Sequence, residues 1–234
     1  MNSQVYGSSS VYTASADARM VFIRKTYSHL AGAVALFVGL SAVMYSAGVG
    51  ESILGFMGQS RYGWLLILGG FMVAGYLAQG LARSNKSLGT QYAGLALYAI
   101  AEAVIFTPMI YIAAKMAPGV LPEATIITLA AFTGLTAFVL FSKTDFSFLG
   151  PALAICGFVA IGAIVCGAIF GFSLGIGFSA LMVLFASGAI VYSTSNVLRV
   201  YQTDQYVAAA LDLFAAVALL FWYVLRILME LQRR

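Results

Sequence analysis

The sequence predicts an all-α membrane protein with seven transmembrane helices, and three observations support that prediction. First, 62% of the 234 residues are hydrophobic and only 9% are charged. A soluble domain carries about 25% charged residues, so this chain lacks the polar side chains that a water-facing surface needs. Second, the apolar residues form seven runs of the length that a bilayer requires, about 20 residues each. Third, the connecting segments are short and leave no room for a soluble catalytic domain.

The expected spans follow one another along almost the whole chain. Their ranges are 27–48, 62–82, 91–115, 122–142, 149–171, 174–196 and 206–229. Only the turn around 171–175 joins the fifth and sixth spans, which makes them an antiparallel hairpin. Residues 1–20 are small and polar, and we expect them to form a disordered cytoplasmic tail. Residues 21–234 then form the seven-span transmembrane domain.

Positive charges in the short loops predict how the chain crosses the bilayer. An odd number of spans puts the two termini on opposite faces. The loops of the C-terminal face contain Arg61 and Lys115, while Arg226, Arg233 and Arg234 lie at the end of the chain and receive less weight. The N-terminal face carries seven basic residues: Arg19, Arg24, Lys25, Arg83, Lys86, Lys143 and Arg199. This distribution predicts a cytoplasmic N-terminus and an outer C-terminus, and it explains the net charge of +4 without a nucleic-acid partner.

Ionisable residues within the spans are the candidate functional residues, because a charge in lipid is costly. Asp212 lies about six residues into the last span, and Arg83 closes the second span on the same face, so we expect the two to be within reach of one another. Such a pair would plug a pathway from the cytoplasm; a static ion pair, or an Arg83 that reaches lipid phosphate, is the alternative. Glu102 lies near mid-membrane, either on an ion path or as a protonated, hydrogen-bonded packing residue.

Two features of the spans concern packing. Pro108, six residues after Glu102, removes a backbone hydrogen bond from the third span. The resulting kink is expected to open a cavity. Ala31, Ala35 and Gly39 recur at helical spacing in the first span, a pattern that favours close approach of a neighbouring helix.

The sequence does not predict an enzyme. GFSLG at 171–175 matches the G-x-S-x-G nucleophile pattern, but that pattern requires a strand–turn–helix context and a histidine base. His29 is the only histidine and is expected on the opposite face. Cys156 and Cys166 are ten residues apart, about 15 Å along a helix, which is too far for a disulfide. No cofactor or metal-ligating cluster is predicted.

Four stretches occur in the order typical of one protein family. They are FIRKTY at 22–27, SKTDFSFLG at 142–150, SGAIVYSTSN at 187–196, and AAAL at 208–211 followed by LRIL at 225–228. Together they resemble the Bax-inhibitor-1 family, also called the transmembrane Bax inhibitor motif family. The stretch at 142–150 is the most specific, and the resemblance covers the chain from about residue 20 onward.

The resemblance implies a fold and two rival activities. In the fold, two three-helix layers enclose a central last helix. The first activity is a pH-sensitive passive calcium leak, in which one carboxylate on the sixth span and one on the seventh share a proton and pair with an arginine on the second. The second belongs to a bacterial branch that restrains the membrane protease FtsH without conducting ions, through its N-terminal tail. Both would place this chain in a bacterial inner membrane, with calcium, protons or FtsH as partners besides lipid.

The family's site residues carry over only in part. Arg83 matches the arginine of the second span, but the acid of the sixth span falls on Ser193 and that of the seventh on Ala216. Asp212 lies four residues before Ala216, on the same helical face and one turn nearer the cytoplasm, and is the candidate replacement. A single carboxylate cannot share a proton as a coupled pair does. The candidate gate and ion-path residues are therefore Arg83, Asp212, Glu102 and Ser193.

Overall fold

The computed structural model describes residues 10–59, 62–142 and 144–233. This part of the chain forms eight α-helices: α1 Ala16–Ser46, α2 Val49–Gln59, α3 Gly63–Ala82, α4 Leu88–Met116, α5 Val120–Phe141, α6 Leu149–Phe170, α7 Gly175–Arg199 and α8 Tyr206–Gln232. Seven of the eight, all except α2, are long and apolar enough to cross a membrane. The predicted all-α membrane fold is therefore confirmed, and the seven expected spans coincide with these helices, except at the beginning of α1.

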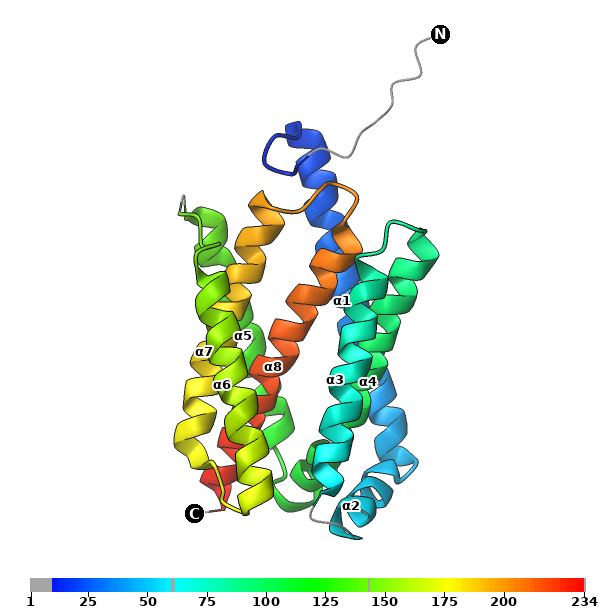
Figure 1. Cartoon of the computed structure of the whole chain (residues 1–234), viewed down its shortest axis with the longest axis vertical. Helices are drawn as coiled ribbons and strands as arrows, with labels where there is room; N and C mark the ends of the chain where they lie inside the picture. The colour runs from blue at the N-terminus through cyan, green and yellow to red at the C-terminus, as the bar shows by residue number, and fades with distance from the viewer. Residues whose placement is uncertain (1–9, 60–61, 143, 234) are drawn as a thin grey trace.

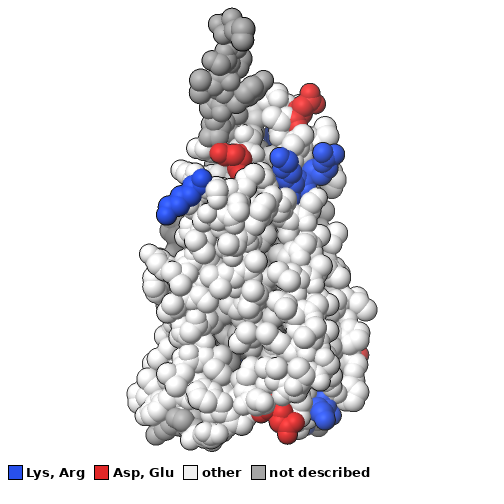
Figure 2. Space-filling view, turned by 90° about the vertical axis from the view of Figure 1, so that its right-hand side faces the viewer, with Lys and Arg blue, Asp and Glu red and all other residues white. Residues whose placement is uncertain are grey.

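Helix α8 is the centre of the bundle. It lies between α1, α3 and α4 on one side and α5, α6 and α7 on the other (Figure 1). It is also the most buried of the seven long helices. The outer helices instead expose large apolar side chains such as Phe158 and Val159 on α6, as expected where lipid is the solvent. On the face drawn in Figure 2, nearly all charged side chains lie toward the two ends of the molecule.

Serine caps and glycines set several helix ends. Ser15 accepts a hydrogen bond from the Ala18 amide at the start of α1, and Ser87 caps α4 in the same way; both satisfy an amide that the helix leaves unpaired. Gly171 and Gly175 have φ angles of 77° and 64°, which are open to glycine without steric cost. They bracket the tight turn between α6 and α7, so the expected hairpin is present.

The N-terminal side of the fold differs from the expectation in two respects. Helix α1 begins at Ala16, inside the segment assigned to a disordered tail, because Ser15 caps it there. Residues 10–13 form a turn in which Val11 is buried. Residues 1–9 of the expected tail lie outside the described part. Helix α2 was not expected at all, because its 11 residues are too few to span a bilayer.

Two helix backbones come very close where Gly94 of α4 lies against α3. The sequence had suggested such an approach at Ala31, Ala35 and Gly39 of α1 instead. Ala31, Ala35 and Gly39 are exposed, and a Cβ on Gly39 would meet nothing within 4 Å, so the expectation of close packing there is wrong. A Cβ on Gly94 would lie 2.5 Å from the Ala82 amide nitrogen of α3. This approach fixes the end of α3 against α4, one residue before Arg83.

Candidate functional site

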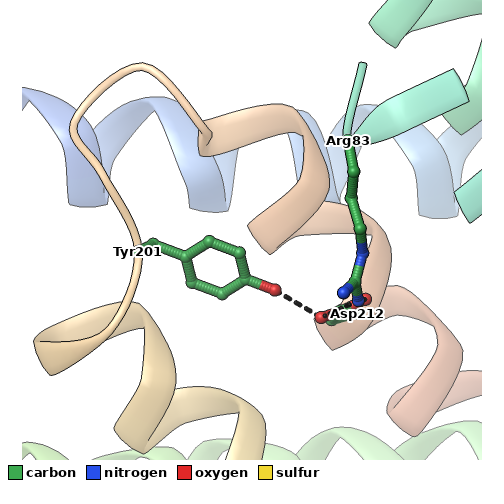
Figure 3. Close-up of polar contacts among 3 residues, drawn as sticks. All are labelled: Arg83, Tyr201 and Asp212. Carbon is green, nitrogen blue, oxygen red and sulfur yellow. Dashed lines mark hydrogen bonds and ion pairs between the residues drawn. The ribbon is translucent and has the colours of Figure 1, made fainter. Parts of the chain in front are cut away.

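Arg83 and Asp212 form an ion pair at one end of the bundle. Nη2 of Arg83 lies 2.9 Å from both carboxylate oxygens of Asp212 (Figure 3). The contact predicted from the sequence is therefore present. Arg83 follows the last residue of α3, where a cation also complements the helix dipole, and Asp212 raises the pKa of its guanidinium. The Arg83 side chain is 53% exposed and that of Asp212 is 23% exposed, so the pair lies near the surface rather than deep in the core.

Tyr201 is a third member of the site. It lies in the loop between α7 and α8, and its hydroxyl donates a hydrogen bond to Oδ2 of Asp212 (Figure 3). Burial raises the pKa of this hydroxyl, which therefore stays protonated and able to donate. Asp212 thus accepts hydrogen bonds from two residues on two different elements. Sequence reasoning missed Tyr201, because a tyrosine in a polar loop carries no signal of its target.

Glu102 lies inside the bundle and apart from this pair. Its side chain is 5% exposed, one turn after the buried Tyr98 on α4. Among the described residues, no ion pair or hydrogen bond joins Glu102 to Arg83. Burial of Glu102 fits the packing alternative as well as an ion path.

Ser193 and Ala216, the positions that the resemblance assigns to the two family acids, are both buried. Ser193 on α7 is 8% exposed and Ala216 on α8 is 4% exposed. In the described structure the Ser193 hydroxyl makes no hydrogen bond to Arg83 or Asp212. The ion pair with Arg83 therefore contains one carboxylate, on the central helix, and Ser193 and Ala216 add no charge to it.

Aromatic side chains fill the interior below the ion pair. Trp222 lies ten residues after Asp212 on α8, about 15 Å along the helix. The Phe106 ring stacks on Phe221 at 5.7 Å and meets Trp222 edge-on at 4.9 Å. Trp64 of α3 stacks on Trp222 at 6.0 Å. These ring contacts pack α3 and α4 against α8 in this layer of the bundle.

A cavity of about 480 Å³ lies beyond these rings, toward the C-terminal end of α8. It is lined by residues of α2, α3, α4 and α8 and of the α6–α7 turn, among them Met57, Trp64, Pro108, Trp222 and Arg226. A cavity beside Pro108 was expected from the proline kink, and it is present. Arg226 borders it together with Arg233 and Glu230.

The stretch at 142–150 ties the loop between α5 and α6 to the end of α7. Ser195 is buried on α7. Its hydroxyl accepts a hydrogen bond from the Phe146 amide and donates one to Asp145. The guanidinium of Arg199 donates to the Thr144 carbonyl. Lys143 lies outside the described residues. This most specific motif of the sequence thus has a structural role at the same end of the bundle as Arg83.

Asp145 is expected to stabilise this loop in a pH-dependent way. Hydrogen bonds from Ser147 lower the pKa of its carboxyl, so the stabilisation is fully present above the ordinary pKa of Asp. It is lost as the pH falls through the lowered folded value. Asp145→Asn should lower the Tm at neutral pH, and the difference should shrink as the pH falls below the ordinary pKa of Asp, about 3.9. Asp204→Asn, on an exposed carboxylate of the α7–α8 loop, is the control; a difference that persists in acid would contradict the assignment.

Comparison with known proteins places the chain in a family. The sequence model of the family described as "Inhibitor of apoptosis-promoting Bax1" matches residues 19–234. Bax inhibitor 1 of Schizosaccharomyces pombe is 28% identical over 221 residues, 92% of this chain and 78% of the relative. An uncharacterized protein of Pseudomonas aeruginosa is 34% identical over 109 residues, 46% of this chain and 49% of the relative.

The chain is also similar to a viral protein. The Golgi anti-apoptotic protein of Vaccinia virus (strain Lister) is 31% identical over 114 residues, 47% of this chain and 46% of the relative. The matches thus cover about half of the bacterial and viral relatives, whereas the family model covers nearly the whole chain, including Arg83 and Asp212. The chain belongs to the Bax inhibitor family of multi-pass membrane proteins.

Proposed function

We propose that this protein is a bacterial inner-membrane cation leak whose cytoplasmic entrance is closed by Arg83 and Asp212. One observation carries the proposal: an ion pair between the end of α3 and the central helix stands at the mouth of the bundle. A cation that enters there meets the guanidinium of Arg83 first, which repels it and occupies the carboxylate that would bind it. Helix α3 packs mainly on α4 and touches α8 less, so the pair is a main link between α3 and α8 at this end.

Loss of the charge on Asp212 would open this entrance. Without that charge Arg83 has no partner on α8, so α3 loses a link to α8 and the mouth loosens. Ser193 and Ala216 carry no charge, so neither can take over the contact with Arg83. Calcium, or protons themselves, are the cations that the family resemblance suggests.

Calcium flux into proteoliposomes tests this proposal. We expect little flux through the wild type and clearly more through Asp212→Asn, which removes the carboxylate charge and leaves Arg83 without its partner. Protein-free vesicles give the baseline. Flux at the baseline for both the wild type and Asp212→Asn would contradict a cation leak.

A second candidate function is that of a non-conducting modulator of the FtsH protease. The observation in its favour is that Ser193 and Ala216, the positions that the resemblance assigns to the family acids, are buried and uncharged. The aromatic contacts of Phe106 and Trp222 also oppose a permanently open path. Baseline flux in the experiment above would favour this candidate, and binding to FtsH would then be the next measurement.

We also propose that the N-terminus is cytoplasmic and the C-terminus lies outside. The described chain ends lie at opposite ends of the bundle (Figure 1), as expected for seven crossings. Arg83, Lys86 and Arg199 lie toward the N-terminal end, in agreement with the positive-inside rule. A periplasm-dependent reporter enzyme fused to the C-terminus should therefore be active, and the same reporter inserted after Lys86 should be inactive. The reverse pattern would contradict this orientation.

A further inference from the structure

The loop that carries Tyr201 is held by the N-terminal turn of the chain. The Val11 amide donates a hydrogen bond of 2.9 Å to the Tyr201 carbonyl. Ser10 forms an antiparallel bridge with Gln202, and its hydroxyl donates to the Arg199 carbonyl at 3.4 Å. These contacts join segments about 190 residues apart in the sequence. They are not a product of local chain geometry.

The side chain of Val11 anchors this turn. It is 0% exposed and belongs to the same apolar cluster as Phe22 of α1 and Val197 of α7, against which Tyr201 also packs. Its neighbour Tyr12 is 65% exposed. One buried side chain therefore attaches the turn to the bundle, and an attachment of this kind opens more readily than a core helix does.

Tyr201 joins this turn to the ion pair. Its backbone carbonyl accepts the hydrogen bond from Val11, and its hydroxyl donates to Asp212. The Tyr201 amide donates a second backbone hydrogen bond, to the Asn196 carbonyl at the end of α7. Among the described residues, these two bonds hold the Tyr201 backbone, and the turn at Val11 supplies one of them.

We infer that Tyr201 is a positioning residue for Asp212, and that the turn at residues 10–13 latches Tyr201 in place. The inference deepens the proposed function, because it names the element that regulates the cytoplasmic mouth. When the turn is displaced, the α7–α8 loop moves, Asp212 loses its second hydrogen-bond donor, and the carboxylate pairs with Arg83 alone. Water then reaches the face of α8 just below the pair.

Thiol labelling tests this inference without measuring ion flux. Cys156 and Cys166, both exposed on α6, are replaced by serine, and Ala215→Cys provides a reporter. Ala215 lies three residues after Asp212, on the same face of α8 and about one turn deeper. The probe is a water-soluble maleimide applied to purified protein. Its rate of reaction reports how often water-borne reagents pass the ion pair.

Loosening the latch should raise the labelling rate. Val11→Asp places a charge at a buried site and should raise the labelling rate about tenfold. A factor of this size is expected when the free energy of burying one valine side chain no longer holds the turn closed. Val11→Ala, a milder change, should give a smaller increase and serves if Val11→Asp does not fold. Tyr12→Ser, at the exposed neighbour, is the matched control and should label like the parent. The Tm of each variant shows that the bundle stays folded.

A double-mutant comparison separates latching from general loosening. Tyr201→Phe keeps the ring but removes the hydroxyl, and it should raise the labelling rate by itself. In the Tyr201→Phe background, Val11→Ala should add little, because the turn acts through that hydroxyl. A Val11→Ala rate equal to the parent's, or fully multiplicative effects of the two substitutions, would overturn the inference. Raised labelling without calcium flux would support the latch and contradict the proposed cation leak.

Discussion

Arg83→Gln is expected to lower the free energy of unfolding by about 1–2 kcal/mol, and Asp212→Asn by a similar amount. Exposed ion pairs contribute about 0–1 kcal/mol, whereas removing one partner of a buried pair costs about 3–5 kcal/mol. The Arg83 and Asp212 side chains are 53% and 23% exposed, which places the pair between these limits. Tyr201 still donates to Asp212 when Arg83 is lost, and this further limits the cost.

The double mutant decides whether the two residues act as a pair. If they do, the loss in Arg83→Gln/Asp212→Asn should be smaller than the sum of the two single losses, by about 1 kcal/mol. Urea unfolding in detergent, with the same micelle for all four proteins, gives the required free energies. Losses that add within error would mean that Arg83 is anchored by lipid and that Asp212 is an isolated acid.

Gly94→Ala is expected to cost about 2–3 kcal/mol, at the upper end of the range for overpacking a core. The new Cβ would lie 2.5 Å from the amide nitrogen of Ala82 and 2.6 Å from the carbonyl oxygen of Ala78. Both are backbone atoms of α3, so no side chain can turn away to make room. Helix α3 must shift as a whole, and Arg83 at its end shifts with it.

Gly69→Ala is the matched control, because a Cβ at Gly69 of α3 would meet nothing within 4 Å. This change should be neutral or slightly stabilising, since alanine favours a helix over glycine by about 1 kcal/mol. Urea unfolding and the Ala215→Cys labelling rate should both respond to Gly94→Ala but not to Gly69→Ala. Equal stability of the two variants would contradict the close contact of α3 and α4.

The sequence predicted the spans well because their signal is strong. Long apolar runs and a bilayer of fixed thickness leave little freedom, so most helices end within three residues of the expected ranges. Arg83 and Asp212 were predicted to meet for the same reason: each is a costly charge at the same depth, and each needs a partner. Depth along a helix is readable from residue number, because each residue adds about 1.5 Å.

The rest of the site depends on contacts across the bundle, which residue spacing does not encode. The small residues of α1 had the spacing of a packing face but point outward, whereas Gly94 stands alone and makes the close approach. Tyr201 and Val11 lie in segments that look like a polar loop and a polar tail. Their importance arises because the chain brings residues 10–13 against residues 199–202, and nothing in either segment indicates the other.

Closure of the cytoplasmic mouth by the ion pair is tested most directly by calcium flux through Arg83→Gln proteoliposomes. In the wild type the pair is intact and flux should be low, whereas Arg83→Gln should leak at a rate near that of Asp212→Asn. Lys86→Gln is the control, because it removes an exposed positive charge three residues away and leaves the pair in place. Closure by this pair predicts flux in Arg83→Gln well above that in Lys86→Gln and the wild type. Equal flux in all three proteins would contradict it.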